Sequence, residues 1–312
     1  MNDNSLFTFS QLQVGSENGD VDCLFQLAIW YLVGTNVPRD LIKARALLRQ
    51  VISIGHVDAA LMEIAFTANG TGSLPDWRLA VELLQESANS DTLAAEYLGL
   101  LNNMSLDPEG GPSTLPDLDI LRSSPNISVF SNFISAAEAA HIVSLVAADM
   151  EPATVADPVS GRQIPHPIRK SDNAVIGPAR ESLVVQAINK RIAYATNTST
   201  SSGEPLTVLR YRPGQQYKAH LDTLPHTSNQ RTKTAILYLN EGFRGGETIF
   251  PSLGISITPE AGRLLIFSNV DDNGSPDPLS RHAGLPVHKG TKWIATRWIR
   301  ARSYNSWTDY GN

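Results

Sequence analysis

The stretch Leu209–Asp222, with the sequence L-R-Y-R-P-G-Q-Q-Y-K-A-H-L-D, decides how this chain is interpreted. It ends on His220 and Asp222, two positions apart in a segment that reads as a β-strand. Because side chains i and i+2 project from the same face of a strand, the imidazole and the carboxylate would converge on one point. Sixty residues past Asp222, His282 precedes another predicted strand, K-W-I-A-T-R-W-I-R.

Two histidines and one carboxylate are a donor set with known chemistry. They can occupy one face of an octahedral ion and leave the opposite positions open, as in non-haem Fe(II) oxygenases. Neutral imidazole and ionised carboxylate are the forms that bind, so metal affinity should fall as the pH drops. An H-x-D pair also occurs by chance, in which case His220 is a surface histidine and Asp222 a turn residue.

The segment from Ile127 onward predicts the fold around these residues. It begins with a predicted strand and continues with a helix, which Ser135 and Glu138 open as a capping box. A polar, Pro-rich loop is expected at 152–172 and a second helix at 181–196. Only short strands with Gly and Pro turns follow, which indicates a β-sandwich or a β-barrel. A double-stranded β-helix, or jelly roll, with flanking helices fits the number of strands and is the fold that we predict.

Three sequence blocks in the rear half carry a family resemblance. They are R-Y-R-P-G-Q-Q-Y-K-A-H-L-D, Y-L-N-E-G-F-R-G-G-E-T-I-F-P and R-H-A-G-L-P-V-H-K-G-T-K-W, in that order. With them, the region from about Ile127 to Ser303 resembles the prolyl 4-hydroxylase branch of the Fe(II)/2-oxoglutarate dioxygenases. The resemblance implies that His220, Asp222 and His282 bind Fe(II).

The same resemblance implies a site for the cosubstrate. Lys292 would bind the distal carboxylate of 2-oxoglutarate, and Tyr211 would donate a hydrogen bond to it; core packing is the alternative for Tyr211. A dicarboxylate buried in a barrel needs a cation, because an unpaired buried charge costs roughly 3–5 kcal/mol. Thr296 and Trp298 share the strand face of Lys292 by alternation and should also point inward, and we include Thr296 among the residues predicted to bind the cosubstrate.

Several positions match residues that contact the substrate in plant and algal prolyl hydroxylases. The matching residues are Arg169, Ser171, Glu204, Tyr217, Arg231 and Trp298. One position departs from the family pattern, because Arg300 stands where the family usually carries a histidine, two residues after the matched tryptophan. We include Arg300 among the candidate substrate-binding residues, and the departure puts the substrate in doubt.

The implied activity is hydroxylation of C4 of a peptidyl proline. The reaction would use Fe(II) as its cofactor and consume 2-oxoglutarate and O2, with succinate and CO2 as co-products. L-ascorbate would restore over-oxidised iron. A second hypothesis keeps this chemistry but has a free amino acid or small molecule as substrate, with Arg300 binding its carboxylate. A third hypothesis is an adaptor in which the repeats bind proteins and the oxygenase domain is inert.

The front of the chain repeats itself at an offset of 36 residues. Gly19–Gly34 aligns with Gly55–Gly70, and the Asp that precedes the next predicted helix recurs at Asp40 and Asp76. A third, shorter unit begins at Asp91. Each unit predicts a helix, a Gly-containing turn, an Asp cap and a second helix, which is typical of stacked helical hairpins.

These units resemble Sel1-like repeats, which are relatives of tetratricopeptide repeats. The resemblance implies an α-solenoid with a protein-interaction surface, which would recruit the peptide or protein substrate. The alternative is a helical cap that only stabilises the rear domain, since fewer than about three repeats are marginal alone. We therefore predict a repeat domain at 1–103, a Pro- and Gly-rich linker at 104–126 and the oxygenase domain at 127–312.

Charge and cysteine content narrow the partners and the compartment. The residues before Ile127 contain 6 Lys and Arg against 16 Asp and Glu, whereas the remainder contains 19 against 15. This acidic chain without a basic run argues against nucleic acid as the main partner. Cys23 is the only cysteine and excludes an intrachain disulfide. We see no signal peptide and no membrane-spanning run, and we expect a cytoplasmic protein.

Overall fold

The structure is a computed structural model that describes residues 7–156 and 163–309. The chain divides into two compact units. The first contains residues 1–110 together with 178–186, and the second contains 111–177 and 187–312. The segment 178–186 is tied to the first unit, because Asn69 Nδ2 donates to the carbonyl of Pro178 and Gln186 Nε2 donates to that of Ala65.

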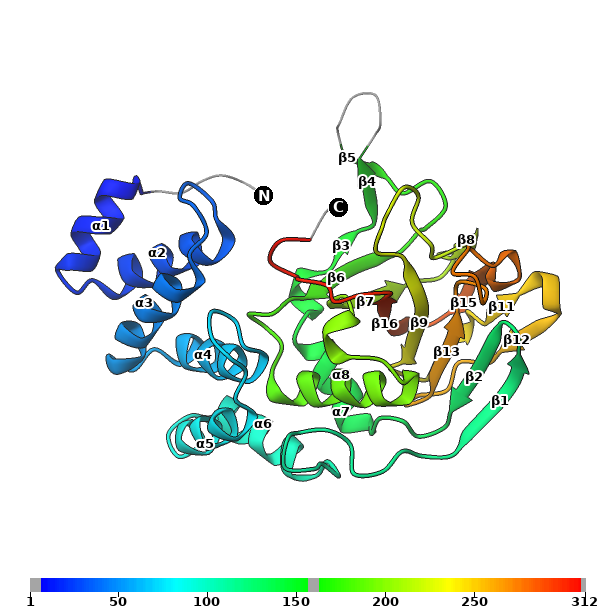
Figure 1. The fold of residues 1–312 in the computed structure, drawn as a ribbon, viewed down its shortest axis with the longest axis horizontal. Coiled ribbons are helices and arrows are strands. Elements are labelled where there is room, and N and C mark those ends of the chain that lie inside the picture. The colour runs from blue at the N-terminus through cyan, green and yellow to red at the C-terminus, as the bar shows by residue number, and fades with distance from the viewer. Residues whose placement is uncertain (1–6, 157–162, 310–312) are drawn as a thin grey trace. The chain divides into compact units, whose positions relative to one another are not determined.

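The first unit is helical (Figure 1). Its helices are α1 (Phe9–Glu17), α2 (Val21–Val33), α3 (Leu41–Ser53), α4 (Val57–Asn69), α5 (Trp77–Ser87) and α6 (Thr92–Asn102). Consecutive helices pack on one another, and the interfaces bury small residues such as Ala28, Ala44 and Ala80, each with no exposed surface. Small side chains let neighbouring helix backbones approach closely, as the repeat pattern predicts.

The 36-residue repeat is preserved in the backbone. Gly34 ends α2 and Gly70 ends α4, both in the left-handed conformation that glycine adopts without strain. Asp40 and Asp76 cap α3 and α5 with nearly the same dihedral angles, φ/ψ of −143°/93° and −140°/96°. In each case the carboxylate accepts a hydrogen bond from the backbone three residues on, which satisfies a free amide at the helix start.

The second unit is built mainly from β-strands. The strands are β1 (Leu118–Ser123), β2 (Asn126–Phe130), β3 (Glu151–Pro152), β4 (Thr154–Ala156), β5 (Gln163–Pro165), β6 (Asp172–Ile176), β7 (Leu206–Tyr211), β8 (Tyr217–His220), β9 (Arg231–Tyr238), β10 (Arg244–Gly245), β11 (Thr248–Phe250), β12 (Ile255–Ile257), β13 (Leu264–Ser268), β14 (His282–Gly284), β15 (Val287–Lys289) and β16 (Lys292–Arg300). Helix α7 (Ala136–Ser144) starts at the predicted capping box of Ser135 and Glu138. Helix α8 (Leu183–Thr196) runs from the first unit's segment into the second.

Two antiparallel sheets enclose the core of this unit. The larger sheet has the order β1-β2-β13-β9-β16-β7-β6-β3, and the smaller has the order β12-β11-β14-β8. Apolar side chains from both meet between them, for example Phe267 of the larger sheet and Phe250 of the smaller, whose ring centroids lie 5.1 Å apart. The helical hairpins and the jelly roll confirm the predicted fold class. The topology also makes β8 and β14 neighbours, and β7 and β16 neighbours.

Two segments differ from the sequence-based expectation. The region 104–126, predicted as a linker, contains β1, which pairs with β2 at the edge of the larger sheet. All six residues of β1 are exposed, so no alternation of polar and apolar residues marks this strand. The loop predicted at 152–172 contains the hairpin of β4 and β5, whereas its residues 157–162 lie outside the described part of the chain.

Candidate active site

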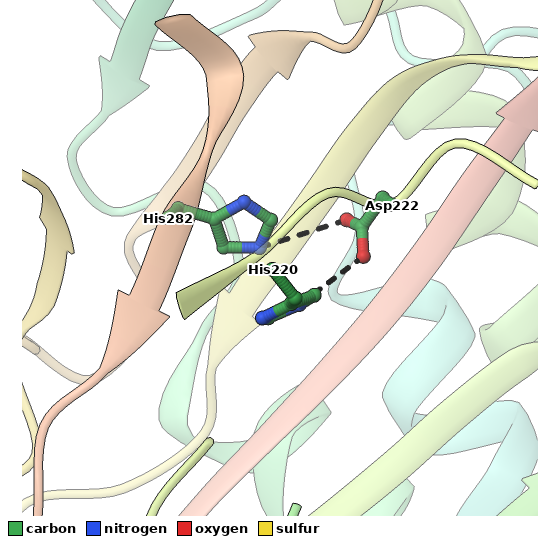
Figure 2. Close-up of side chains that lie close together, drawn as sticks. All are labelled: His220, Asp222 and His282. Atoms are coloured by element: carbon green, nitrogen blue, oxygen red, sulfur yellow. Dashed lines mark ion pairs between the residues drawn. The ribbon is translucent and has the colours of Figure 1, made fainter. Parts of the chain in front are cut away.

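Two imidazoles and one carboxylate meet in the second unit (Figure 2). In the smaller sheet His220 of β8 is the register partner of His282 of β14, so 62 residues of separation reduce to one strand spacing. Asp222 follows β8 by two residues. His220 Nε2 lies 3.4 Å from Asp222 Oδ1, and His282 Nε2 lies 3.7 Å from Asp222 Oδ2. The three ligand atoms lie within 4.8 Å of one another, and all three residues are buried.

The outer nitrogen of each imidazole is held by the backbone. His220 Nδ1 lies 2.8 Å from the carbonyl oxygen of Lys218, and His282 Nδ1 lies 3.0 Å from that of Ser280. A carbonyl oxygen only accepts, so each Nδ1 carries the proton and each Nε2 presents a lone pair. Metal-binding histidines are commonly oriented by such a partner on the second ring nitrogen. Both lone pairs face the Asp222 carboxylate.

The charge state of the cluster also suits a divalent cation. Burial opposes ionisation of Asp222, but the neighbouring His282 and His220 and the hydroxyl of Thr234 hold the pKa of this carboxyl below its ordinary value. Burial lowers the pKa of His282 to about 4, against the pull of Asp222. At neutral pH the cluster therefore offers one carboxylate and a neutral His282, the forms that bind metal. Two neutral nitrogens and one carboxylate oxygen fit the donor set of non-haem Fe(II).

The three residues of this cluster line a pocket in the second unit. Its empty volume is about 520 Å³, including the space where it opens to solvent. Lys292, at the start of β16, lines the same pocket and is 3% exposed. Its Nζ donates a hydrogen bond to the carbonyl of Gly246. Burial lowers the pKa of Lys292 to about 8, although the nearby Glu247 opposes the shift. A buried ammonium with so few partners is well suited to hold an anionic group.

Two residues that carry hydroxyl groups, Tyr211 and Thr296, line the same pocket as this ammonium. Tyr211 is the register partner of Lys292, and its ring centroid lies 5.6 Å from Nζ. Burial raises the pKa of Tyr211, so its hydroxyl is a donor at neutral pH. Thr296 lies four residues further along β16, on the same face of the strand as Lys292, and lines the same pocket. The structure therefore brings together the three residues that we predicted for the cosubstrate.

The sequence reasoning missed two hydroxyls in this part of the pocket. Tyr238 of β9 places its ring centroid 5.5 Å from Lys292 Nζ, and its hydroxyl donates to Thr248 Oγ1 at 2.8 Å. Thr248 of β11 lines the pocket. Both residues stand in the block Y-L-N-E-G-F-R-G-G-E-T-I-F-P that we singled out. The available signal was their position on predicted strands, where Tyr238 shares a face with Ile236 and Thr248 shares a face with Phe250, both of which are core residues.

Three of the predicted substrate residues line the pocket, namely Arg169, Tyr217 and Trp298. The Tyr217 ring stacks on His220 with a centroid separation of 3.5 Å, and the Arg169 guanidinium lies 5.5 Å from the Tyr217 ring centroid. Burial raises the pKa of Tyr217 to about 12. Among the described residues, neither Arg169 Nε nor Trp298 Nε1 has a hydrogen-bond partner, although both atoms are buried. The pocket wall thus offers two donors.

Comparison with known proteins identifies the family. Residues 206–300 match the 2OG-Fe(II) oxygenase superfamily. The protein "Probable prolyl 4-hydroxylase 4" of Arabidopsis thaliana is 33% identical over 209 residues, which cover 59% of this chain and 70% of the relative. The chain belongs to the 2OG-Fe(II) oxygenase superfamily, as a homologue of the prolyl 4-hydroxylases. It is a dioxygenase, and the resemblance stated for its rear half is confirmed.

Two solved structures are among those similar to parts of this chain. A viral collagen prolyl hydroxylase from Paramecium Bursaria Chlorella virus-1 is 29% identical, covers 56% of this chain and 96% of its own, and gives a TM-score of 0.46. A Sel1 repeat protein from Oxalobacter formigenes is 22% identical, covers 30% of this chain and 38% of its own, and gives a TM-score of 0.27. None of the described helices is long and apolar enough to cross a lipid bilayer.

Three other predicted substrate residues, Glu204, Arg231 and Arg300, form a cluster of charged side chains outside the pocket lining. Arg231 donates two hydrogen bonds to the Glu204 carboxylate, at 2.6 and 2.7 Å, and Arg300 Nε donates to the same carboxylate. The Arg231 guanidinium lies 4.0 Å from the centroid of the Trp298 ring, which links the cluster to the pocket. Ser171, which precedes β6, is buried but is not part of the pocket lining.

Arg300 points toward the C-terminal residues of the oxygenase. One of its terminal nitrogens donates to the carbonyl of Asn229 at 2.7 Å, and its guanidinium lies 5.2 Å from the Tyr304 ring. It is 6% exposed and does not line the pocket. In this position Arg300 joins Glu204 to the loop around Asn229 through its Nε and one terminal nitrogen.

Proposed function

We propose that this protein hydroxylates C4 of a proline within a peptide or protein, using Fe(II), 2-oxoglutarate and O2 and releasing succinate and CO2. One observation carries the proposal. Two imidazole Nε2 atoms and a carboxylate converge in a pocket that a buried ammonium also lines, as a chelated oxo-dicarboxylate requires. The curated relatives that are named prolyl 4-hydroxylases support the choice of proline.

In this proposal His220, Asp222 and His282 hold Fe(II). The bound metal supplies the redox chemistry that couples oxidative decarboxylation of 2-oxoglutarate to insertion of oxygen into a C–H bond. The protein's own contribution is position. The backbone carbonyls of Lys218 and Ser280 fix both imidazoles with Nε2 directed inward. The buried site excludes bulk water, which strengthens every electrostatic contact within it.

Lys292, Tyr211 and Thr296 bind the distal carboxylate of 2-oxoglutarate in this scheme. The ammonium of Lys292 would exchange part of its contact with the Gly246 carbonyl for a charged partner, and the two hydroxyls would donate to the same carboxylate. Since the residues lie on neighbouring strands β7 and β16, their spacing is set by the sheet rather than by a loop. This fixes the oxo-acid end toward the metal ligands.

The substrate would lie against Tyr217 and Trp298 at the pocket wall. Aromatic faces suit the apolar ring of proline, and the unpaired donors Arg169 Nε and Trp298 Nε1 suit the carbonyl oxygens of a peptide. Ser171 and the cluster of Glu204, Arg231 and Arg300 would support this wall from outside the lining. A peptide offers several acceptors along its backbone, which is why we favour it over a single small molecule.

The second hypothesis assigned the carboxylate of a free amino acid to Arg300. In the structure Arg300 already donates to Glu204 and to the Asn229 carbonyl, and it does not line the pocket. A free amino acid would therefore need another cation. Arg169 lines the pocket and is the candidate that remains for that role.

Two further parts of the proposal concern partners. L-ascorbate would restore iron that becomes over-oxidised in turnover without substrate. The helical hairpins of the first unit would bind the protein that carries the target proline, as stacked repeats commonly offer extended binding surfaces. A mass-spectrometric search for +16 Da residues on proteins captured by the full-length chain identifies the target protein.

The test measures succinate release from 2-oxoglutarate with proline-rich peptides and, separately, with free amino acids. We expect peptide-dependent release by the wild type, at least about a thousandfold slower release after His220→Ala, and hydroxyproline in the product. His288→Ala is the matched control, because His288 is exposed on β15 and has no part in the site. Wild-type rates in the His220→Ala variant contradict the metal assignment. Release that responds to free amino acids and not to peptides contradicts the peptidyl substrate.

A further inference from the structure

A fully buried asparagine, Asn269, connects to the candidate metal ligands by two routes. It directly follows β13, has no exposed surface and lies outside the pocket lining. Its Nδ2 donates to Thr234 Oγ1 at 2.9 Å, and Thr234 Oγ1 lies 2.6 Å from Asp222 Oδ2. Thr234, on β9, is also fully buried. None of the sequence motifs singled out either residue.

The direction of both hydrogen bonds follows from chemistry alone. An ionised carboxylate only accepts, so the hydroxyl of Thr234 must donate its single proton to Asp222. That proton is then unavailable to Asn269, so the asparagine must present its NH2 group to Thr234 Oγ1. The amide orientation therefore rests on the donors and acceptors of the partners. The relay runs in one direction, from Asn269 through Thr234 to Asp222.

The backbone of Asn269 leads to a second ligand. Its carbonyl accepts a hydrogen bond from the amide of Asp277 at 3.0 Å. Asp277 caps the short 3-10 turn Pro278–Ser280, accepting from the Leu279 amide and, through its carbonyl, from the Ser280 hydroxyl. The carbonyl of Ser280 ends this turn and accepts from His282 Nδ1. One residue thus anchors both the carboxylate and one imidazole.

The cost of burying Asn269 indicates that it serves more than packing. Its Oδ1 is buried and has no hydrogen-bond partner among the described residues. An unsatisfied buried acceptor costs about 1–3 kcal/mol, which an apolar residue of similar shape would avoid. A residue kept at such a cost, and aimed at a ligand through one hydroxyl, is better explained by the orientation that it gives to that ligand.

We propose that Asn269 is a positioning residue that sets the orientation of the metal ligands, Asp222 through the side-chain relay and His282 through the capped turn. The inference rests on the proposed function, because it takes Asp222 and His282 as ligands. Thr234 holds Oδ2 and limits rotation of the carboxylate, so that the geometry offered to the cation is set before the cation binds. Orienting partners of this kind typically contribute 10- to 100-fold to metal affinity.

The experiment measures the affinity of the full-length metal-free protein for Mn²⁺ by calorimetry, with the visible spectrum of bound Co²⁺ as a second readout. We expect Thr234→Val to weaken Mn²⁺ binding by about 10- to 100-fold and Asn269→Leu by about tenfold, since the Thr234 hydroxyl survives but loses its fixed direction. Thr234→Ser, which keeps the hydroxyl, should stay within about threefold of the wild type. Both weakened variants should show an altered Co²⁺ spectrum.

Thr232→Val is the matched control. Thr232 lies two residues before Thr234 on the same strand, and within the described part of the chain its hydroxyl donates to the carbonyl of Ile299 alone. The thermal unfolding midpoint of each metal-free variant is measured in parallel, so that affinity is compared between folded proteins. Asn269→Leu removes the unsatisfied acceptor and should leave this midpoint close to that of the wild type, whereas a purely structural role predicts a lower midpoint and unchanged affinity.

Wild-type Mn²⁺ affinity in the folded Thr234→Val and Asn269→Leu variants overturns the proposal. So does a Thr234→Ser variant that loses as much affinity as Thr234→Val, because packing rather than the hydroxyl would then be responsible. Failure of the proposed function gives a different result. In that case wild-type protein binds Mn²⁺, the variants weaken that binding as stated, and no proline peptide is hydroxylated.

Discussion

Two buried cations, one in each unit, illustrate how the halves of this protein differ. Arg45 of the helical unit is 5% exposed and donates five hydrogen bonds, to Glu63, Thr67, Thr71 and Ser73. These use every N–H of its guanidinium. Lys292 of the oxygenase unit is 3% exposed and, among the described residues, donates one hydrogen bond, to a backbone carbonyl.

The difference separates a structural charge from a binding charge. Arg45 has a carboxylate partner in Glu63 and leaves no donor for a ligand. Lys292 has two N–H groups to spare in a pocket that also contains three candidate metal ligands. Glu247 is near enough to act on this charge, but no ion pair joins it to Lys292 among the described residues, so the ammonium can accept an anionic partner from outside the fold. Incomplete pairing, rather than burial, marks the candidate site.

Truncating the two cations should give opposite results, and this is the largest effect that we expect. Lys292→Ala should raise the KM for 2-oxoglutarate by about 100-fold, because the dicarboxylate loses its cation. Its free energy of unfolding should change little, since an under-paired charge is removed. Arg45→Ala should lower the free energy of unfolding by about 3 kcal/mol, because Glu63 is left buried with only the exposed Arg49 as an ion-pair partner.

Steady-state kinetics and urea unfolding of both variants check this prediction. Arg45→Ala should leave the KM for 2-oxoglutarate of the folded protein unchanged, so each variant is the control for the other. A loss of stability without a change in KM after Lys292→Ala would mean that Lys292 is a structural charge like Arg45.

The second effect concerns pH and separates the cations by their ionisation. Burial lowers the pKa of Lys292 to about 8, and the protonated form is the one that binds a carboxylate. As the pH rises above 8, the free protein loses this proton, and the KM for 2-oxoglutarate should rise by up to tenfold per pH unit. Below pH 8 the dependence from this group should vanish. A guanidinium keeps its proton over this range, so Lys292→Arg should remove the dependence.

Measurement of the KM between pH 7 and 9.5 checks the direction. The peptide concentration is kept saturating, so that a change of peptide binding with pH does not contribute to the KM for 2-oxoglutarate. A KM that falls or stays constant across this range in the wild type would contradict the assignment of Lys292 to the cosubstrate.

The smallest effect concerns the intermediate case, in which Arg231 and Arg300 share one carboxylate on Glu204. Arg300→His restores the residue that the family usually carries. The bidentate contact of Arg231 survives, so we expect a loss of only about 1–2 kcal/mol in the free energy of unfolding, mainly from the contact with the Asn229 carbonyl. The KM for a proline peptide should change less than threefold.

Chemical unfolding and peptide kinetics of the Arg300→His variant test this third case. Glu204→Gln is the comparison, because it leaves two guanidinium groups without their carboxylate and should destabilise the protein more. If Arg300→His instead raises the peptide KM strongly at unchanged stability, Arg300 contacts the substrate and belongs with Lys292 rather than with Arg45.

Parts of the fold were accessible from sequence because their signals are local. Asp40 and Asp76 precede apolar periodic segments and do cap α3 and α5. Gly34 and Gly70, which lie 36 residues apart, do end α2 and α4. The exposed strand β1 was missed, because a strand with no buried face carries no alternation. Its existence depends on hydrogen bonds to β2 and on no pattern in its own side chains.

The candidate site divides in the same way. The pair His220 and Asp222 is visible because positions i and i+2 of the predicted strand share a face, although β8 ends at His220 and Asp222 follows it, and Lys292 is visible because it opens the last predicted strand. The direction of Arg300 was not visible, since its partner Glu204 lies 96 residues away. Thr234 and Asn269 were missed for the same reason, because a threonine and an asparagine are common residues that acquire a role only through their neighbours.

The sequence by itself determined which residue types can bind a metal and a dicarboxylate, together with the helical repeat and its caps. Residue spacing within one strand or one helix determines these features, and this spacing can be read directly from the sequence. The tertiary structure alone decided which charges are fully paired and which are left for a ligand. Pairing is a property of three-dimensional neighbours, and the strand order that brings β7, β9, β13 and β16 together is set by the shared core rather than by any one segment.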